Sequence, residues 1–209
     1  VLSVLEGCAK EPFSILYKKI DSTLRGNIGY EIDAILKGTN RSLCFMAPSY
    51  PEQKRTLVAG VLMVGGKPMT STEVIRDGAS HESHVYKLLE HQSKNKIGMI
   101  DLNCVASNRE QLQNTVAKEQ KKGNKIIIFD AVSRKDLANI VEVAFSLDEP
   151  PLFVGSAGLA EEVAKKLSPS KVTLPQTSGK KASKHALIIS GSTSSVTHQQ
   201  LKRIEQSTI

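Results

Sequence analysis

Residues 17–31 read Y-K-K-I-D-S-T-L-R-G-N-I-G-Y-E, and this stretch predicts both a fold class and a binding site. A β-type run over 13–20 stops at Asp21, and an amphipathic helix begins near Asn27. The residues gathered at the turn are Lys19, Asp21, Ser22, Thr23 and Arg25, with Gly26 and Gly29 nearby. Cations, a carboxylate, hydroxyls and the N–H groups of a helix start can together hold a small hydroxylated anion. In open α/β sheets, ligands bind at such strand-to-helix turns.

The rest of the chain repeats the succession of strand and helix. Apolar, β-branched runs predict strands at 14–20, 42–47, 97–102, 125–130 and 152–154, and helical spacing predicts helices at 27–37, 84–91, 107–122, 133–145 and 158–167. Residues 56–68 read as a hairpin around Gly65-Gly66. The order predicts an α/β fold: a mostly parallel sheet with helices on both faces and an antiparallel addition.

The domain boundaries follow from a change in composition. Residues 169–184 are rich in Ser, Lys, Pro and Thr and read as a linker after a first domain over 1–168. Residues 185–209, with a strand at 186–190 and a helix at 193–206, read as the beginning of a second α/β domain. Neither end of the chain shows a capped element or a polar tail, so we expect a piece of a longer protein.

Composition narrows the class of partner. The 209 residues carry a net charge of +7 with a pI near 9.3, which suits nucleic acid, membranes or anionic metabolites. Aromatic residues make up 4% and Trp is absent, so platforms for stacking nucleotide bases are few. No apolar run reaches about 18 residues, the length a membrane helix needs. Three cysteines without a C-x-x-C pair predict free thiols in a reducing cytoplasm.

Two further turns share the design of the first. They are V-G-S-A-G-L at 154–159 and S-G-S-T-S-S at 190–195, each between an apolar strand and a helix. Neither matches the Walker or the dinucleotide fingerprint, and each alone is compatible with ordinary tight-turn chemistry. Three such turns in one short chain favour an enzyme that handles anions.

Several single residues leave two interpretations open. Arg25 can hold a carboxylate with two parallel hydrogen bonds, or form a surface ion pair. Lys19 shares strand parity with Asp21 and so faces the predicted site, whereas Lys18 points to the other face. Asp21 is a candidate catalytic base or a helix cap. Asp130, at the end of a strand, binds a sugar hydroxyl or a metal, or caps the next loop.

Weaker candidates lie elsewhere on the chain. Ser49 and Arg55 follow the strand at 42–47 and could form a second wall of the pocket. His81 and His84 lack the spacing of a metal site, so we predict no protein-bound metal there.

At this point a family resemblance is evident. Residues 18–27, K-K-I-D-S-T-L-R-G-N, resemble the signature of the four-carbon acid sugar kinases, a family that includes D-threonate, D-erythronate-type and 3-oxo-tetronate kinases. The resemblance continues, in the family's order, through 47–51 with Arg55, 83–85, 130–132, 154–160 and 190–194. It covers nearly the whole chain.

The resemblance implies an amino-terminal domain that binds the sugar acid and a carboxyl-terminal domain that binds ATP with Mg²⁺. It implies a catalytic pair, Asp21 and Arg25, and substrate contacts from Lys19, Ser22, Arg25, Gly26, Ser49, Arg55, His84, Ser156 and Gly158. ATP contacts would come from Ser190, Gly191, Ser192 and Thr193. An Asp-Asp-containing strand should lie upstream of Val1 and the rest of the ATP site downstream of Ile209, so we expect this chain alone to be inactive.

Two other functions stay open from sequence alone. A sugar-acid sensor would use the same pocket without ATP, and a basic nucleic-acid-binding module would use the net positive charge. We expect a small-molecule sugar acid and ATP as partners, with neither nucleic acid nor membrane. The sequence leaves open the particular four-carbon acid, the hydroxyl that is phosphorylated and the oligomeric state, a homodimer included.

Overall fold

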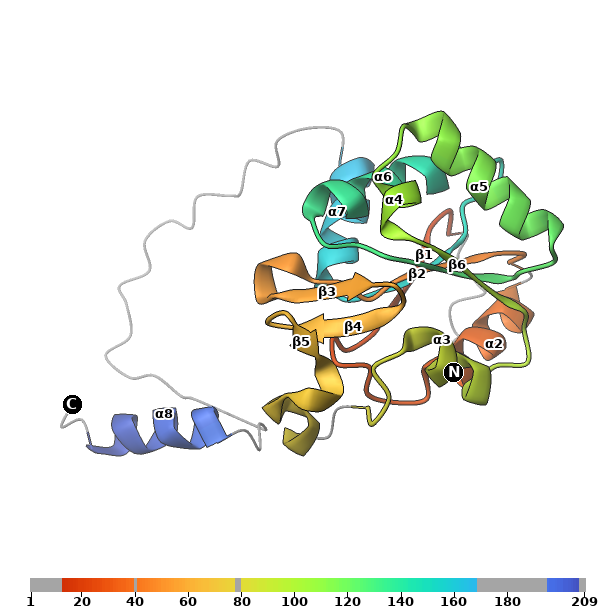
Figure 1. Cartoon of the computed structure of the whole chain (residues 1–209). Helices are drawn as coiled ribbons and strands as arrows, with labels where there is room; N and C mark the ends of the chain where they lie inside the picture. The colour runs from red at the N-terminus through yellow and green to blue at the C-terminus, as the bar shows by residue number, and fades with distance from the viewer. Residues whose placement is uncertain (1–12, 40, 78–79, 169–194, 207–209) are drawn as a thin grey trace. The chain divides into compact units, whose positions relative to one another are not determined.

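The structure, a computed structural model, describes residues 13–39, 41–77, 80–168 and 195–206 (Figure 1). The chain divides into two compact units, Val1–Pro169 and Ser170–Ile209. The described part of the second unit is one helix, α8 (Ser195–Gln206). The predicted strand at 186–190 and the predicted linker lie outside the described residues.

The first unit is built on a parallel sheet of five strands in the order β1-β8-β2-β7-β6. The strands are β1 (Leu16–Lys19), β2 (Cys44–Ala47), β6 (Ile97–Ile100), β7 (Ile126–Phe129) and β8 (Leu152–Gly155). Each lies within a range that the apolar runs predict, or extends it by one residue. The predicted α/β fold with a mostly parallel sheet is therefore confirmed.

Helices cover both faces of this sheet, as Figure 1 shows. The helices of this unit are α2 (Ile28–Thr39), α3 (Val85–Gln92), α4 (Leu102–Val105), α5 (Arg109–Lys121), α6 (Arg134–Ala144) and α7 (Ala157–Leu167). One apolar cluster joins α2 and α3 to one face, and a second joins α4, α5, α6 and α7 to the other.

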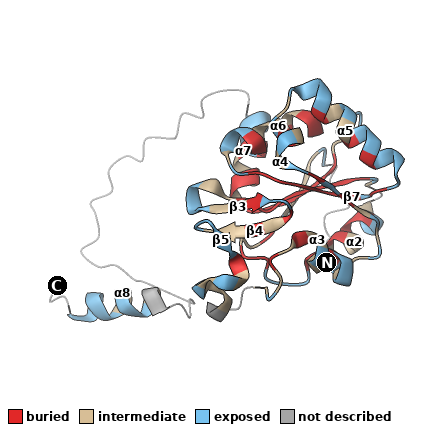
Figure 2. Cartoon of the chain, viewed as in Figure 1, coloured by how far each residue is buried: buried red, intermediate tan, exposed pale blue. Residues whose placement is uncertain are grey.

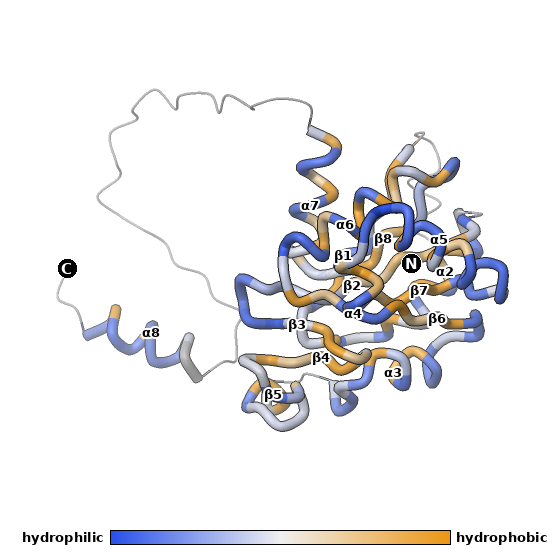
Figure 3. Tube along the Cα trace, turned by 45° about the horizontal axis from the view of Figure 1, so that its top comes forward, coloured by the Kyte–Doolittle hydropathy of each residue, from blue (hydrophilic) through white to orange (hydrophobic). Residues whose placement is uncertain are grey.

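The central strands have no polar face because both of their faces are buried. In β7, Ile126 and Ile128 belong to the first cluster, whereas Ile127 and Phe129 belong to the second. This alternation follows from the period of two in a strand. The central strands β2, β7 and β8 are buried along their whole length (Figure 2), and β2 and β7 are among the most hydrophobic segments of the unit (Figure 3).

A small antiparallel sheet is inserted between β2 and α3. It consists of β3 (Arg55–Val58), β4 (Val61–Val64) and β5 (Lys67–Pro68), and we call it the meander. The predicted hairpin around Gly65-Gly66 is confirmed as the turn between β4 and β5. A second tight turn, at Ala59 and Gly60, joins β3 to β4 and was not predicted.

The 3-10 turns η1 (Pro51–Gln53), η2 (Met69–Ser71) and η3 (Glu73–Asp77) flank the meander. All three lie in turn-rich segments of the chain, and they are too short to give a periodic sequence signal.

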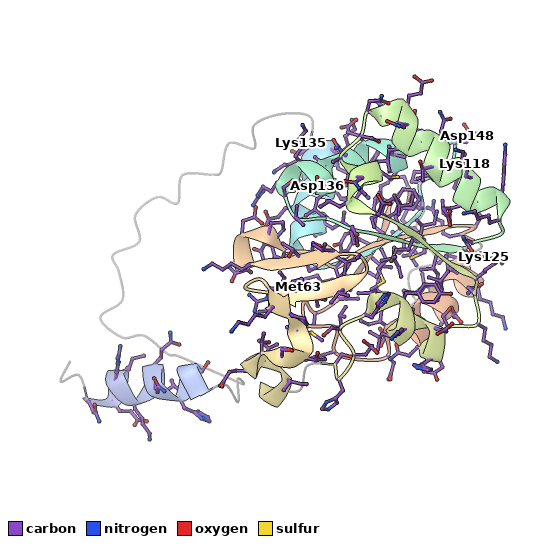
Figure 4. The ribbon with its side chains drawn as sticks, viewed as in Figure 1. Met63, Lys118, Lys125, Lys135, Asp136 and Asp148 are labelled. Atoms are coloured by element: carbon purple, nitrogen blue, oxygen red, sulfur yellow. The ribbon has the colours of Figure 1, made fainter. Side chains whose placement is uncertain are left out.

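Helix caps illustrate how local chemistry sets boundaries. Ser133 and Asp136 form a reciprocal capping box at the start of α6, as the sequence predicts. Figure 4 shows Asp136 at this end of the helix. The predicted cap of α5 at Ser107 is wrong: Asn108 caps it, with its Oδ1 atom accepting from the Gln111 N–H at 2.9 Å.

Candidate functional site

The carboxyl ends of the five parallel strands form one edge of the sheet. There β1 leads into the turn at Asp21, β8 into Ser156, β2 into Ser49, and β7 into Asp130. Neighbouring strands β8 and β2 are followed by chain segments on opposite faces of the sheet, since α7 packs in the second cluster and the meander in the first. Such a reversal opens a crevice that is the usual ligand position in open α/β sheets.

The turn after β1 is closed by its own carboxylate. Asp21 accepts hydrogen bonds from the Thr23 backbone N–H at 3.0 Å and from the Thr23 hydroxyl. It lies well before α2 begins at Ile28, so the helix-cap interpretation of Asp21 is wrong. Burial raises the pKa of Asp21, but the Thr23 hydrogen bonds and the charges of Arg25 and Lys19 outweigh it and lower the pKa overall.

Two cations flank this carboxylate. Arg25 Nε lies 3.6 Å from Asp21 Oδ2, and the Arg25 side chain is 48% exposed. Lys19 is exposed and donates from Nζ to the Ile20 carbonyl at 2.9 Å. Lys18 instead forms an ion pair with Glu31 on α2, which agrees with the predicted opposite orientation of the two lysines.

The backbone of the turn is unusual at its centre. Leu24 has φ of 60°, a left-handed conformation that is rare for a bulky residue. Its side chain is 1% exposed and belongs to the first apolar cluster, so burial holds the strained backbone in place. Gly26 has φ of 99°, which its lack of a side chain permits. The chain therefore leaves β1 through a rigid, buried anchor, while Ser22, partly exposed, and Arg25 remain accessible.

A chain of hydrogen bonds runs along the edge from β1 to the meander, and we call it the edge chain. Tyr17 Oη donates to the Ser156 carbonyl at 2.6 Å, and the Ser156 hydroxyl donates to the Ser49 carbonyl at 2.8 Å. The Ser49 hydroxyl in turn donates to the Ala131 carbonyl at 2.8 Å. Ala131 and Leu57 exchange two backbone hydrogen bonds, at 2.9 and 3.0 Å. Both serine side chains are buried and donate to the main chain, so they form the floor of the edge.

Gly158 belongs to the same floor. A Cβ atom there would lie 2.8 Å from the Ser49 carbonyl oxygen and 3.2 Å from Leu137. The close approach brings the first turn of α7 against the segment that follows β2, and Ser156 caps the helix through its hydroxyl. The structure thus brings Ser49, Ser156 and Gly158 together.

Arg55 begins β3 and lies on the inner face of the meander. It alternates with Thr56 and shares its face with Leu57, which is fully buried. Its Nη1 atom donates to the Gln53 carbonyl at 2.6 Å, whereas Nε is buried without a hydrogen-bond partner. A buried unpaired donor on a cation is costly, and an anionic ligand would satisfy it.

The turn between β3 and β4 is held by Asp130. The carboxylate accepts from the Ala59 N–H at 2.7 Å and from the Gly60 N–H at 2.9 Å. Burial raises the pKa of Asp130, although hydrogen bonds from Gly60, Ala59 and Leu102 oppose the rise. His84 packs close by, since a Cβ atom on Gly60 would lie 2.9 Å from its Cε1 atom. The His84 Nδ1 atom is buried without a partner.

These contacts change the interpretation of Asp130. The sequence offered a sugar hydroxyl, a metal or the following loop as its partner, but the carboxylate binds a turn 70 residues upstream. Sequence spacing gave no signal for this pairing. Among the described residues, no group of three or more His, Cys, Asp or Glu side chains could hold a metal ion.

The structure does not describe the predicted ATP contacts, and it describes only part of the chain in which a membrane helix could be sought. Ser190, Gly191, Ser192 and Thr193, the predicted ATP contacts, fall outside them. Within those ranges, no helix combines the length and apolar character needed to cross a membrane.

The fold and its edge define an α/β domain with polar and charged side chains gathered at the carboxyl ends of its parallel strands. Comparison with known families identifies the family of this domain. Residues 1–163 match the model of the sugar-binding N-terminal domain. The chain belongs to this family.

Relatives with assigned activities are kinases of sugar acids. The chain is 33% identical over 191 residues to a D-erythronate kinase of Heliobacterium modesticaldum, covering 90% of this chain and 42% of that protein. It is 32% identical over 197 residues to a D-threonate kinase of Salmonella typhimurium, covering 93% of this chain and 44% of that protein. The chain therefore spans less than half the length of these relatives.

Solved structures show the same fold. A Haemophilus influenzae protein superimposes with a TM-score of 0.72 at 24% identity, over 79% of this chain and 41% of that one. A domain of unknown function from Bordetella bronchiseptica, solved as a domain-swapped dimer with bound citrate, gives a TM-score of 0.66 at 28% identity. That match covers 78% of this chain and 39% of the Bordetella chain.

Proposed function

We propose that this chain is the sugar-acid-binding part of an ATP-dependent kinase that phosphorylates a four-carbon sugar acid of the threonate, erythronate or 3-oxo-tetronate type. The observation that carries the proposal is the turn after β1, where Arg25 and Lys19 flank Asp21 at the carboxyl edge of a parallel sheet. The family match and the kinase names of the relatives support it.

The chemistry of the edge suits a small hydroxylated carboxylate. Arg25 and Arg55 supply planar guanidinium groups, which bind carboxylates through paired hydrogen bonds. Lys19, Ser22, Gly26 and His84 would add hydrogen bonds or shape to the same pocket. Citrate, which the Bordetella neighbour binds, is itself a hydroxylated carboxylate.

Ser49, Ser156 and Gly158 would contribute to the pocket differently. Because both serine hydroxyls donate to carbonyl groups of the edge chain, the three residues would form its floor.

Asp21 is proposed as the group that accepts the proton of the attacking hydroxyl, or that orients it. Its lowered pKa makes the carboxylate a weaker proton acceptor than an ordinary aspartate, so orienting the hydroxyl suits Asp21 better than removing its proton. An aspartate upstream of Val1, as the family resemblance implies, is the alternative base.

ATP and Mg²⁺ complete the proposal. Phosphoryl transfer depends mainly on positioning and on charge neutralisation. Mg²⁺ in such sites is held by phosphate oxygens and one or two carboxylates, so a full protein cage is not needed. Ser190, Gly191, Ser192 and Thr193 stay predictions for the nucleotide contacts. A homodimer is also proposed, since the Bordetella neighbour forms a dimer.

The test is a kinase assay on the full-length protein with D-threonate, D-erythronate and a 3-oxo-tetronate, comparing wild type with Arg25→Lys. Lysine keeps the charge but loses the two-pronged geometry, so we expect the KM for the sugar acid to rise by about 10-fold or more while the KM for ATP stays constant. The matched control is Arg109→Lys, because Arg109 is an exposed arginine on α5 with an ion pair to Glu142 at 3.8 Å.

Three results would count against the proposal. Folded protein that turns over no sugar acid refutes the kinase activity. Binding of a sugar acid without ATP binding favours a sensor instead. If the Arg25→Lys variant has the same KM for the sugar acid as Arg109→Lys, Arg25 is not part of the site.

A further inference from the structure

The chain connections that enter and leave the meander do not by themselves fix its position at the edge of the sheet. Its β3–β4 turn projects from two four-residue strands, and short antiparallel pairs alone are only marginally stable. Contacts to the parallel sheet must therefore set its position.

The polar part of this contact consists of the two backbone hydrogen bonds between Leu57 and Ala131 and of the Asp130 side chain, which holds the β3–β4 turn. Asp130 lies at the end of β7 and is 1% exposed, and both of its oxygens accept from consecutive N–H groups of the meander turn. Ala59 and Gly60 have φ of 49° and 73°, so their N–H groups point to one side. Successive N–H groups in such a conformation form a concave anion-binding nest, which here holds the carboxylate.

The position of the β3–β4 turn affects two candidate ligand contacts, Arg55 and His84. Arg55 lies in β3 only four residues before the turn, with its Nε atom buried and unpaired. The residue after His84 donates its N–H to the Gly60 carbonyl at 2.9 Å, and the His84 ring packs against Gly60 itself. A displacement of the turn would therefore move both side chains with respect to the turn at Asp21.

We propose that Asp130 is a positioning residue of the sugar-acid site: by holding the Ala59–Gly60 turn on the end of β7, it fixes Arg55 and His84 with respect to Asp21 and Arg25. The inference rests on the function proposed above, and it assigns to Asp130 no contact with the substrate. An ordinary structural carboxylate would stabilise the fold without affecting the recognition of one substrate.

The experiment compares Asp130→Asn with Glu119→Gln in the full-length protein. Asparagine keeps the shape of the side chain but replaces one accepting oxygen by an NH₂ group, which cannot bind an N–H donor. Glu119 is an equally suitable buried carboxylate, 8% exposed, that accepts from Asn124 and Lys122 at 2.6 Å each. It lies beside the start of β7, at the opposite edge of the sheet, so it controls for the loss of a buried charge.

For Asp130→Asn, we expect kcat/KM for the sugar acid to fall by on the order of 100-fold, as small misplacements of binding groups can cause. The change should appear mainly in the KM for the sugar acid, with the KM for ATP unchanged. Glu119→Gln should leave both KM values at the wild-type level. Hydrogen exchange should show faster exchange of the Ala59 and Gly60 amides in Asp130→Asn alone.

A second variant covers the case in which Asp130→Asn does not fold. Gly60→Ala perturbs the same turn from the other side, since its Cβ atom would meet Met99 Sδ at 2.6 Å and His84 Cε1 at 2.9 Å. It should raise the KM for the sugar acid in the same way. If wild type is active while Asp130→Asn, or failing that Gly60→Ala, keeps its wild-type KM for the sugar acid, the inference is overturned. Absence of wild-type activity would instead refute the proposed function.

Discussion

The contact between Gly158 and the Ser49 carbonyl gives the sharpest test of how the edge is packed. In Gly158→Ala, the added Cβ atom would lie 2.8 Å from that oxygen, whereas an ordinary contact begins near 3.4 Å. The nearest obstacle is a backbone carbonyl oxygen, and Gly158 is itself part of helix α7, so rotation of a side chain cannot relieve this contact. Overpacking of this kind typically costs about 1–3 kcal/mol. Alanine regains at most about 1 kcal/mol of helix propensity.

With the full regain of helix propensity subtracted, the free energy of unfolding should fall by about 0–2 kcal/mol in Gly158→Ala. Urea unfolding followed by circular dichroism suits a chain without Trp, and an unchanged slope would assign the loss to the folded state. The control is Ala164→Gly on the exposed side of the same helix, which removes propensity alone and should cost about 0.5–1 kcal/mol. A Gly158→Ala variant more stable than wild type would refute the packing argument.

Two further changes test the local chemistry. Ser133→Ala removes the capping box of α6 and should lower the free energy of unfolding by about 1 kcal/mol in urea, whereas Ser71→Ala on an exposed turn should not; equal effects would contradict the cap. Asp21→Asn tests the lowered pKa of Asp21, which stabilises the fold above the unfolded-state value near 3.8 and loses that contribution as pH falls through the folded value. The stability difference between wild type and Asp21→Asn should hence be largest near neutral pH and shrink below about pH 4, and a difference that is independent of pH would contradict this assignment.

Most of the elements could be predicted from sequence because their signals are local. The run K-I-I-I-F-D at 125–130 contains only apolar residues between its ends, and such a run fits a strand with two buried faces. The capping residues of α6 lie within four positions of one another. By contrast, Ser107 and Asn108 both suit the N-cap of α5, and only the backbone decides between them.

The candidate site was predicted in part for the same reason. Lys19, Asp21 and Arg25 lie within seven residues, so strand parity and turn chemistry suffice to bring them together. The pairing of Asp130 with Ala59 and Gly60 spans 70 residues and depends on the order of strands in the sheet, which no local pattern records. The β3–β4 turn was missed because its conformation at Ala59 is stabilised by that distant carboxylate and not by its own sequence.

Small hydroxyl residues after strands deserve a different interpretation from the one that sequence suggests. Ser49 and Ser156 have the residue type of a ligand contact, yet both are buried and donate to carbonyl groups of neighbouring segments. At the edge of a parallel sheet, every strand leaves carbonyl groups that its neighbours no longer pair, and a buried one is costly to leave unsatisfied. A serine at the end of one strand can satisfy such a carbonyl from the next. The same residues that favour anion binding therefore also join the strand ends into one rigid edge, and a binding site that relies on a few cations needs such a support to keep them in place.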